Sequence, residues 1–263
     1  MSTTQTQKNP SNVQKSSPRA EAFKTFMKRL LKNKAAVVGG LIILFIILVG
    51  LIGPFLVKTD PNAQNLLNKL QAPSKEHWFG TDNFGRDIFS RIVHGTKLTL
   101  MVGFLSVIIG GVLGVVLGIV AGYYGGIVDT ITMRIMDILL AFPGILLALA
   151  IVSVLGGSLI NVIIAVGIFS VPAFARIVRG STLQVKKLEY IDAVRALGAS
   201  DVRIIFKHIL PNIMSPIIVQ ATMRIATAIL TASGLAFLGL GAQPPEPEWG
   251  AMLSDGRTYM HNA

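Results

Sequence analysis

The chain has 263 residues, of which 52% are hydrophobic and only 14% are charged, and its formal net charge is +11. Soluble globular domains carry about 25% charged residues, so this composition excludes an ordinary soluble domain and indicates a membrane protein. The chain has no cysteine, which excludes a disulfide framework, a thiolate metal site and a nucleophilic thiol.

The segment 1–34 is polar and basic, with eight Lys or Arg residues and one acidic residue. Residues 1–20 are rich in Ser, Thr, Gln, Asn and Lys, a composition that predicts disorder. From Ala22 to Lys34, apolar residues recur at helical spacing between basic ones. This pattern predicts either an amphipathic helix on the inner membrane surface or a basic flank that only fixes the topology.

Three long runs without a charged residue predict membrane-spanning helices: Ala35 to Val57, Leu98 to Val128 and Ile138 to Ala175. A bilayer core about 30 Å thick needs about 20 apolar residues per helix. We therefore expect residues 35–57 to form the first transmembrane helix. This run is longer than the apolar region of a cleaved signal peptide, so we expect it to be retained. Residues 58–97 follow as an external segment.

The third run is too long for one span and is interrupted by Gly156-Gly157-Ser158, which predicts two helices in a hairpin. A fifth span is expected from about Ile213 to Gly241, with Arg224 inside it. The sequence thus predicts an all-α, polytopic transmembrane helical bundle with five spans. Residues 98–263 form its core.

The placement of the basic residues indicates the orientation of the chain. The loop 176–211 holds seven Lys or Arg and three acidic residues, whereas residues 242–263 hold one basic and three acidic residues. Basic residues gather in loops on the cytoplasmic side of a membrane, so we expect the N-terminus and the loops 122–137 and 176–211 to be cytoplasmic. Residues 58–97, 156–158 and 242–263 are then external. This distribution accounts for the net charge without nucleic acid as a partner.

One face of the second predicted span carries four glycines at four-residue intervals: Gly110, Gly114, Gly118 and Gly122. Without Cβ atoms, such a face lets a neighbouring helix approach closely. We favour tight packing inside this chain or against a partner, and the alternative is a sliding contact along a pathway. Two prolines inside later spans predict kinks: Pro143 and Pro172.

The sequence contains no phosphate-binding loop and no His-Glu-x-x-His zinc motif, and its four histidines form no metal-ligand pattern. We therefore expect neither nucleotide hydrolysis nor a metal site on this chain. Arg224 is the one charged residue deep in a predicted span, where a charge usually faces the bundle interior or water. It is a candidate for the transport pathway, where it would meet a carboxylate or carbonyl group of the substrate. The alternative is a structural partner on another helix or subunit.

Within the loop 176–211, the spacing of apolar residues predicts two short helices. The first has one apolar face, formed by Tyr190, Ala193, Val194 and Leu197. Gly198 stands where a helix ends in a left-handed cap, and Ser200 is placed to cap the second helix, which we expect Pro211 to end. Periodicity alone leaves two interpretations open: a rigid projection that docks into a partner protein, and a loop that packs on its own bundle.

The residues Asp192-Ala193-Val194, then Gly198, then Leu210-Pro211 resemble the EAA motif of bacterial ATP-binding-cassette (ABC) importer permeases in kind and spacing. Asp192 stands in place of the usual Glu, Val194 in place of the second Ala, and His208 in place of an Ile. In that family the loop is a coupling helix seated in a cleft of the ATPase subunit. The resemblance implies ATPase-coupling roles for Glu189, Tyr190, Asp192, Ala193, Arg195, Ala196, Leu197, Gly198 and Ala199.

Three further segments are similar to one subgroup of these permeases, the peptide and nickel permeases, and specifically to the C-type subunit of dipeptide and oligopeptide importers. They are Phe79 to Arg91, with its Gly-Thr-Asp-x-x-Gly-Arg-Asp-x-x-Ser-Arg pattern, Phe237 to Gly241, and Pro244 to Gly250.

Opposite charges within the first of these segments predict ion pairs that brace an external helix, and the alternative is direct contact of these residues with the substrate. We expect Arg86 to pair with Asp87, and Asp82 to pair with Arg91. Near the end of the chain, Pro244 to Pro247 predicts a stiff external loop because this segment cannot form a regular helix.

The resemblance implies the type I ABC importer permease fold, and a non-catalytic subunit in the bacterial cell membrane with its N-terminus in the cytoplasm. Its implied partners are a second homologous permease, two ABC ATPases, an external solute-binding protein and the lipid bilayer. ATP and magnesium would bind to the ATPases, with no cofactor on this chain. Such permeases usually have a sixth span, so we expect that this sequence is truncated.

The implied function is to form half of the translocation pore of an ATP-driven peptide importer. Dipeptides, longer peptides, glutathione and nickel chelates all stay open as substrates. Two other classes of function stay open as well: a membrane receptor or scaffold that moves no solute, and a secondary carrier.

Overall fold

The computed structural model describes residues 27, 28 and 30–260. The predicted disorder of residues 1–20, and most of the amphipathic helix predicted over 22–34, lie outside the described residues. The chain divides into two compact units, residues 1–46 and 47–263. In chain order, the helices are α2 (Lys34–Leu56), η1 (Leu66–Asn68), α3 (Ile88–Tyr124), α4 (Gly126–Ala141), α5 (Gly144–Leu155), α6 (Leu159–Lys186), α7 (Glu189–Ala196), α8 (Asp201–Ile204), η2 (Ile205–Ile209), α9 (Leu210–Phe237) and α10 (Trp249–Arg257).

The described residues form no β-strand, which confirms the predicted all-α class. Four of their helices are long and apolar enough to cross a membrane: α2, α3, α6 and the continuous helix that contains α9. The pair α4 and α5 adds a fifth candidate span, bent by 92°. The break between α5 and α6 falls at residues 156–158, where the sequence predicts a hairpin.

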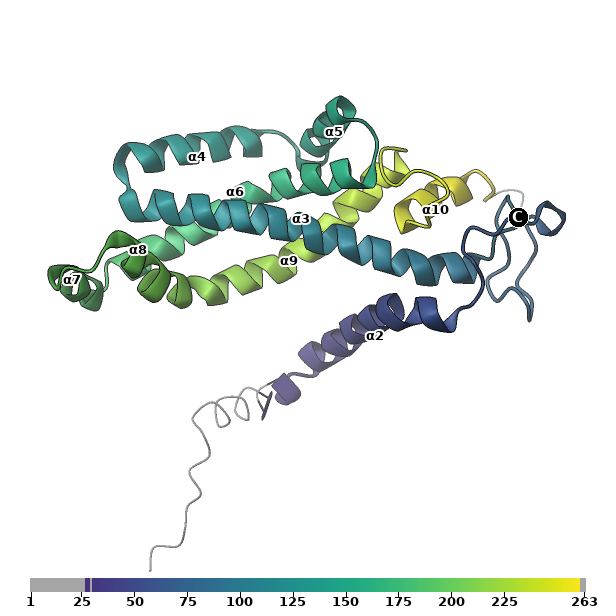
Figure 1. Ribbon diagram of the computed structural model, residues 1–263, viewed down its shortest axis with the longest axis horizontal. Coiled ribbons are helices and arrows are strands. Elements are labelled where there is room, and N and C mark those ends of the chain that lie inside the picture. The colour runs from purple at the N-terminus through teal and green to yellow at the C-terminus, as the bar shows by residue number, and fades with distance from the viewer. Residues whose placement is uncertain (1–26, 29, 261–263) are drawn as a thin grey trace, which may run out of the picture. The chain divides into compact units, whose positions relative to one another are not determined.

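Close contact between α3 and α6 is the main packing of the second unit, and α9 packs against both helices (Figure 1). The glycine face of α3 makes this contact. A Cβ atom added to Gly114 would lie 2.5 Å from the Phe174 Cβ atom and 2.7 Å from the Val171 carbonyl oxygen. Gly110, Gly118 and Gly122 meet α6 at similarly short distances. The glycines therefore serve tight packing inside this chain, the interpretation that the sequence favours.

The prediction of a loop at 122–137 is wrong, because most of this segment belongs to the helix α4. Only Gly125, at φ +69°, separates α3 from α4. The charges that interrupt the apolar pattern lie on a helix, since Asp129 pairs with Arg179 of α6 at 2.5 Å and Asp137 pairs with Arg176 at 2.6 Å. Charged residues paired across two helices thus gave a false signal of a loop.

The two predicted kinks have different outcomes. Pro143 stands at the bend between α4 and α5, where the preceding Phe142 has an extended backbone with ψ 136°, as steric contact with a following proline favours. Pro172 lies inside α6, which runs unbroken from Leu159 to Lys186.

The prediction that Pro211 ends the second short helix is wrong. The segment η2 is one turn of π-helix, in which the Leu210 N–H donates to the Ile205 carbonyl oxygen. Pro211 follows in the first turn of α9, where its missing N–H and fixed φ are tolerated. The helix therefore continues from Asp201 to Phe237.

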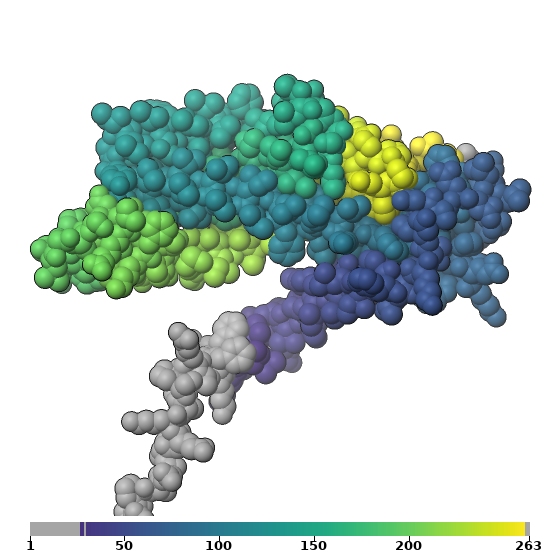
Figure 2. Space-filling view, in the orientation of Figure 1, coloured from purple at the N-terminus to yellow at the C-terminus, as the bar shows by residue number. Residues whose placement is uncertain are grey.

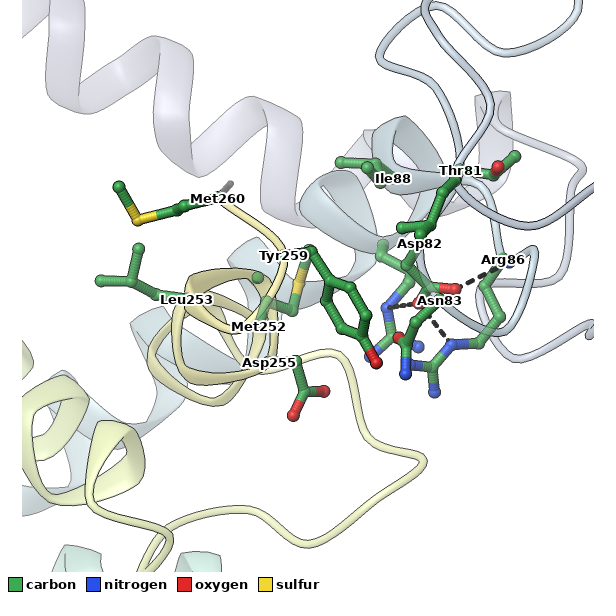
Figure 3. Close-up of a pocket in the computed structure, with 13 residues that line it drawn as sticks. Thr81, Asp82, Asn83, Arg86, Ile88, Met252, Leu253, Asp255, Tyr259 and Met260 are labelled. Carbon is green, nitrogen blue, oxygen red and sulfur yellow. Dashed lines mark hydrogen bonds and ion pairs between the residues drawn. The ribbon is translucent and has the colours of Figure 1, made fainter. Parts of the chain in front are cut away.

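A buried ionic cluster fixes the segment that leads into α3 (Figure 3). Asp82 accepts a hydrogen bond from Arg86 Nε at 2.6 Å and lies 3.7 Å from Arg91 Nε, which confirms the predicted Asp82–Arg91 pair. The predicted Arg86–Asp87 pair is wrong, because Arg86 pairs with Asp82. The Asp87 carboxylate instead lies 3.0 Å from His77 Nδ1 and accepts the Ser90 backbone N–H at 2.7 Å. Asp87 is the N-cap of α3, a position that favours a short acidic side chain.

The same cluster borders a cavity of about 360 Å³ whose other wall is α10 and the residues after it. Asp255 and Tyr259 belong to that wall, and in Figure 3 the Tyr259 ring points across the cavity toward Asn83. The predicted loop at 244–247 is confirmed, since no helix forms between α9 and α10. Trp249 opens α10, and its indole N–H donates to the Ile92 carbonyl oxygen of α3 at 3.0 Å.

We predict that Gly114→Ala destabilises the protein by about 1–3 kcal/mol, because the new methyl group overpacks the α3–α6 contact. The matched control is Gly111→Ala on the same helix, where the nearest atoms would lie 3.6 Å or more from the new Cβ. That control should be neutral or stabilising, since Ala is a better helix former than Gly. Thermal unfolding of both variants in detergent tests the prediction, and equal melting temperatures would contradict it.

Candidate functional site

The helices α7, α8 and η2 form a compact projection at the opposite end of the second unit from α10 (Figure 1). We refer to residues 187–209 as the hairpin. Its central turn has the predicted form: Gly198 has φ +83°, and the Ala199 N–H donates to the Val194 carbonyl oxygen at 3.3 Å. This is the left-handed helix end that glycine favours. Ser200 precedes α8 at the N-cap position, although its side chain makes no capping bond.

The inner side of the hairpin is apolar and fully buried. Ile191, Ile204 and Ile209 are each 0% exposed. They pack in one cluster with Ile119 and Tyr123 of α3, Val178 of α6 and Ile213 of α9. The hairpin is therefore anchored to three helices that the sequence separates widely.

The outer side carries large apolar side chains that are partly or largely exposed. Tyr190 is 41% exposed, Leu197 87%, Val202 64% and Phe206 66%. Figure 2 shows the hairpin in green at the end of the unit, with its outer surface open. An exposed apolar group on a rigid element indicates an interaction site.

The predicted apolar face of α7 is partly wrong. Val194 does approach the buried cluster, but Ile191 supplies the main contact and Tyr190 and Leu197 point outward. The helix α7 has only eight residues and carries apolar side chains on two sides. The spacing of its apolar residues therefore does not predict which side is buried.

Three charged residues lie on α7, the first helix of the hairpin. Glu189 and Asp192 lie in the first turn of α7, where negative charge interacts favourably with the helix dipole. Arg195 donates to Asp192 at 3.3 Å and its guanidinium carbon lies 6.0 Å from the centre of the Tyr123 ring. The Tyr123 hydroxyl is the main cause that raises the pKa of Arg195 above its ordinary value.

The nine residues that the resemblance assigns to ATPase coupling all lie on α7 and the turn after it: Glu189, Tyr190, Asp192, Ala193, Arg195, Ala196, Leu197, Gly198 and Ala199. Arg224 is separate from them. It lies on α9, about 21 Å along the helix from Leu210 at 1.5 Å per residue. Its guanidinium carbon is 5.9 Å from the Phe169 ring centre, and no carboxylate of the described residues forms an ion pair with it.

Sequence reasoning missed four residues that hold the hairpin in place. Two lie within it, Ile191 and Asp201, and two lie on the neighbouring helices, Tyr123 and Lys186. Tyr123 donates to Asp201 at 2.5 Å, and Lys186 donates to the Tyr123 carbonyl oxygen at 2.5 Å. These partners lie up to 78 positions apart, so local spacing carried no signal for them. The one available hint was the position of Asp201 directly after the predicted cap Ser200.

Comparison with known proteins identifies the family. Residues 114–260 match the family described as binding-protein-dependent transport system inner membrane component. Residues 22–73 match the N-terminal TM domain of oligopeptide transport permease C. The dipeptide transport system permease protein DppC of Alkalihalophilus pseudofirmus is 53% identical, over 94% of this chain and 80% of its own length. The chain belongs to the binding-protein-dependent ABC permeases.

A second relative and a solved structure also resemble this permease. The glutathione transport system permease protein GsiD of Pectobacterium atrosepticum is 49% identical, over 90% of this chain and 79% of the relative. A solved structure, an inward facing conformation of the MetNI methionine ABC transporter, aligns with TM-score 0.54 at 23% identity, over 66% of this chain and 82% of that one. This likeness confirms the predicted permease fold.

Membership confirms the predicted family and subgroup. The permease subunits of ABC transporters are themselves non-catalytic, and partner subunits hydrolyse ATP. The family and the apolar helices together make this permease a multi-pass inner-membrane protein that works with ATPase and solute-binding partners.

We predict that Gly198→Val loosens the hairpin, because a β-branched residue at φ +83° is strained by about 1–2 kcal/mol. Nothing lies within 4 Å of the position, so backbone strain is the sole cause. Trypsin should cleave after Arg195 or Arg203 about five to thirty times faster than in the unchanged protein. Gly198→Asn should be milder, since Asn adopts this conformation more readily.

The matched control is Gly180→Val, because Gly180 also has open space around its Cβ position but ordinary helical backbone within α6. Cleavage that rises equally in Gly180→Val and Gly198→Val would show that the turn at Gly198 has no special requirement.

Proposed function

We propose that this permease forms half of the translocation pore of an ATP-driven importer of short peptides, and that the hairpin couples it to an ATPase subunit. The observation that carries the proposal is the combination of a fully buried inner side and an exposed apolar outer side. The inner side packs on the bundle and so fixes the position of the hairpin. The outer side gives a partner an apolar surface to cover.

A docked hairpin transmits force only if both of its sides are held firmly. Burying the exposed side chains of Leu197, Val202 and Phe206 in a groove would contribute about 1.5–3 kcal/mol each, enough for a stable docking surface. The inner residues tie the hairpin to α3, α6 and α9, so a displacement of the docked hairpin passes into the spanning helices. ATP and magnesium bind to the ATPase in this scheme, and this chain needs no cofactor.

The orientation follows from the charges. Seven Lys or Arg residues in 176–211 support a cytoplasmic hairpin by the positive-inside rule, with the N-terminus on the same side. The cavity at α10 then lies on the outer side, where an external solute-binding protein delivers its cargo. A second, homologous permease supplies the other half of the pore.

Short peptides are the substrate class that both kinds of relative share. One relative is named for dipeptides and another for glutathione, itself a tripeptide, and the two are 53% and 49% identical to this chain. The test is ATP-dependent uptake by the isolated complex in vesicles, with a dipeptide, glutathione and a nickel chelate compared. Uptake of the nickel chelate alone would overturn the proposed substrate class.

Docking is tested by cross-linking. Because the chain has no cysteine, Leu197→Cys provides a single attachment point for a benzophenone maleimide. We predict light-induced cross-links from position 197 to the ATPase subunit in the intact complex. The control is Leu67→Cys on η1, which is equally accessible at 94% exposure but lies on the proposed outer side. Cross-links to the ATPase from position 67 and not from 197 would refute the orientation and the docking role.

Arg224 is our candidate for contact with the substrate. A charge within a span is costly unless it meets water or a partner, and a peptide's terminal carboxylate is a partner of the right charge. We predict that Arg224→Gln lowers the uptake of an ordinary dipeptide about tenfold and leaves the uptake of its C-terminally amidated form unchanged. Equal losses for both peptides would assign Arg224 a structural role.

A further inference from the structure

Ile119 and Tyr123 near the C-terminal end of α3 both pack against the hairpin, and Tyr123 also makes a side-chain hydrogen bond to it. This residue is 4% exposed, and its hydroxyl group donates to the Asp201 carboxylate at 2.5 Å. Asp201 is the first residue of α8. The Tyr123 side chain thus joins the last turn of α3 to the first turn of α8.

Two basic residues converge on the same tyrosine. Lys186, the last residue of α6, donates from Nζ to the Tyr123 carbonyl oxygen at 2.5 Å and lies 5.5 Å from its ring centre. This cation occupies one of the carbonyl groups that a helix leaves free at its C-terminus, where the helix dipole favours positive charge. Arg195 of α7 approaches the ring at 6.0 Å. Tyr123 therefore contacts charged groups from α6, α7 and α8.

The neighbouring backbone makes this arrangement rigid. A Cβ atom at Gly122 would lie 2.9 Å from both the Arg179 carbonyl oxygen and the Thr182 Cβ atom of α6. The end of α3 is therefore held against α6 by direct backbone packing, next to Tyr123. If the hairpin is displaced, either the Tyr123–Asp201 bond breaks or α3 moves together with the hairpin.

Apolar contacts and hydrogen bonds differ in how firmly they fix one helix relative to another. The isoleucines beneath the hairpin hold it by the hydrophobic effect, which is non-directional and tolerates sliding. A hydrogen bond to a carboxylate is short and strongly oriented. Of the two kinds of contact, only the second fixes where the hairpin stands along α3.

We propose that Tyr123 is the positioning residue through which movement of the hairpin reaches α3. The proposal rests on the coupling role proposed above for the hairpin. Tyr123 touches neither the ATPase nor the substrate; it fixes the register between α8 and the end of α3, so that docking and α3 move together.

The test compares two adjacent tyrosines in the complete complex, reconstituted in vesicles. Tyr123→Phe removes the hydroxyl and keeps the buried ring. Tyr124→Phe is the matched control, because Tyr124 is 54% exposed and belongs to the same helix turn. The readout is the number of peptides taken up per ATP hydrolysed, together with recovery of the ATPase subunits during purification.

We expect Tyr123→Phe to retain its ATPase subunits and its ATP hydrolysis but to lose about tenfold in peptides per ATP, while Tyr124→Phe behaves as the unchanged complex. Asp201→Ala should cause the same loss. The Tyr123→Phe/Asp201→Ala double variant should lose no more than either single variant, because both remove one interaction.

Three results would overturn the inference: an unchanged ratio in Tyr123→Phe, losses that multiply in the double variant, or loss of the ATPase subunits from Tyr123→Phe, which would make the residue a requirement for assembly. The proposed function fails separately, if the unchanged complex shows no ATP-driven uptake at all.

Discussion

The close approach of α3 and α6 is the constraint on which the rest of the second unit depends. Helices in a bilayer gain little from the hydrophobic effect when they associate, so packing of small residues drives the contact. The four glycines of α3 bring its backbone against α6. This contact sets Tyr123 beside Lys186 and forms the surface on which the hairpin isoleucines pack. At the other end of α3, the Asp87 cap and the Asp82 cluster fix where the helix begins.

Ion pairs are placed where helices meet other elements rather than along the lipid-facing sides. Asp82 holds two arginines that are each 3% exposed, so the cost of burying those charges is offset by pairing and hydrogen bonding. Asp129 and Arg179 bind in a two-bonded arrangement between α4 and α6. Arg224 differs from these residues, since its only close described partner is an aromatic ring. That difference is what separates a pathway candidate from the structural arginines.

The sequence predicts the parts of this structure that local chemistry controls. Charge-free runs gave the spans, and Gly198 gave the turn, because glycine adopts that left-handed backbone with the least strain. The errors arise where tertiary contacts decide. Asp129 and Asp137 looked like a loop because their partners on α6 are distant in sequence. Pro211 looked like a helix end because proline lacks the N–H that a helix interior uses, whereas the π turn before it leads directly into the first turn of α9.

The hairpin follows α6 directly in the chain and packs on the bundle through its isoleucines, and two further connections join it to α9 and α3. One is covalent, through the π turn into the helix that carries Arg224. The other is the Tyr123 contact with α3. π turns are frequent at functional sites, and a hydrogen bond to a carboxylate is short and oriented. On the coupling role proposed above, a displacement of the hairpin would reach α9 through the continuous helix and α3 through the Tyr123 bond.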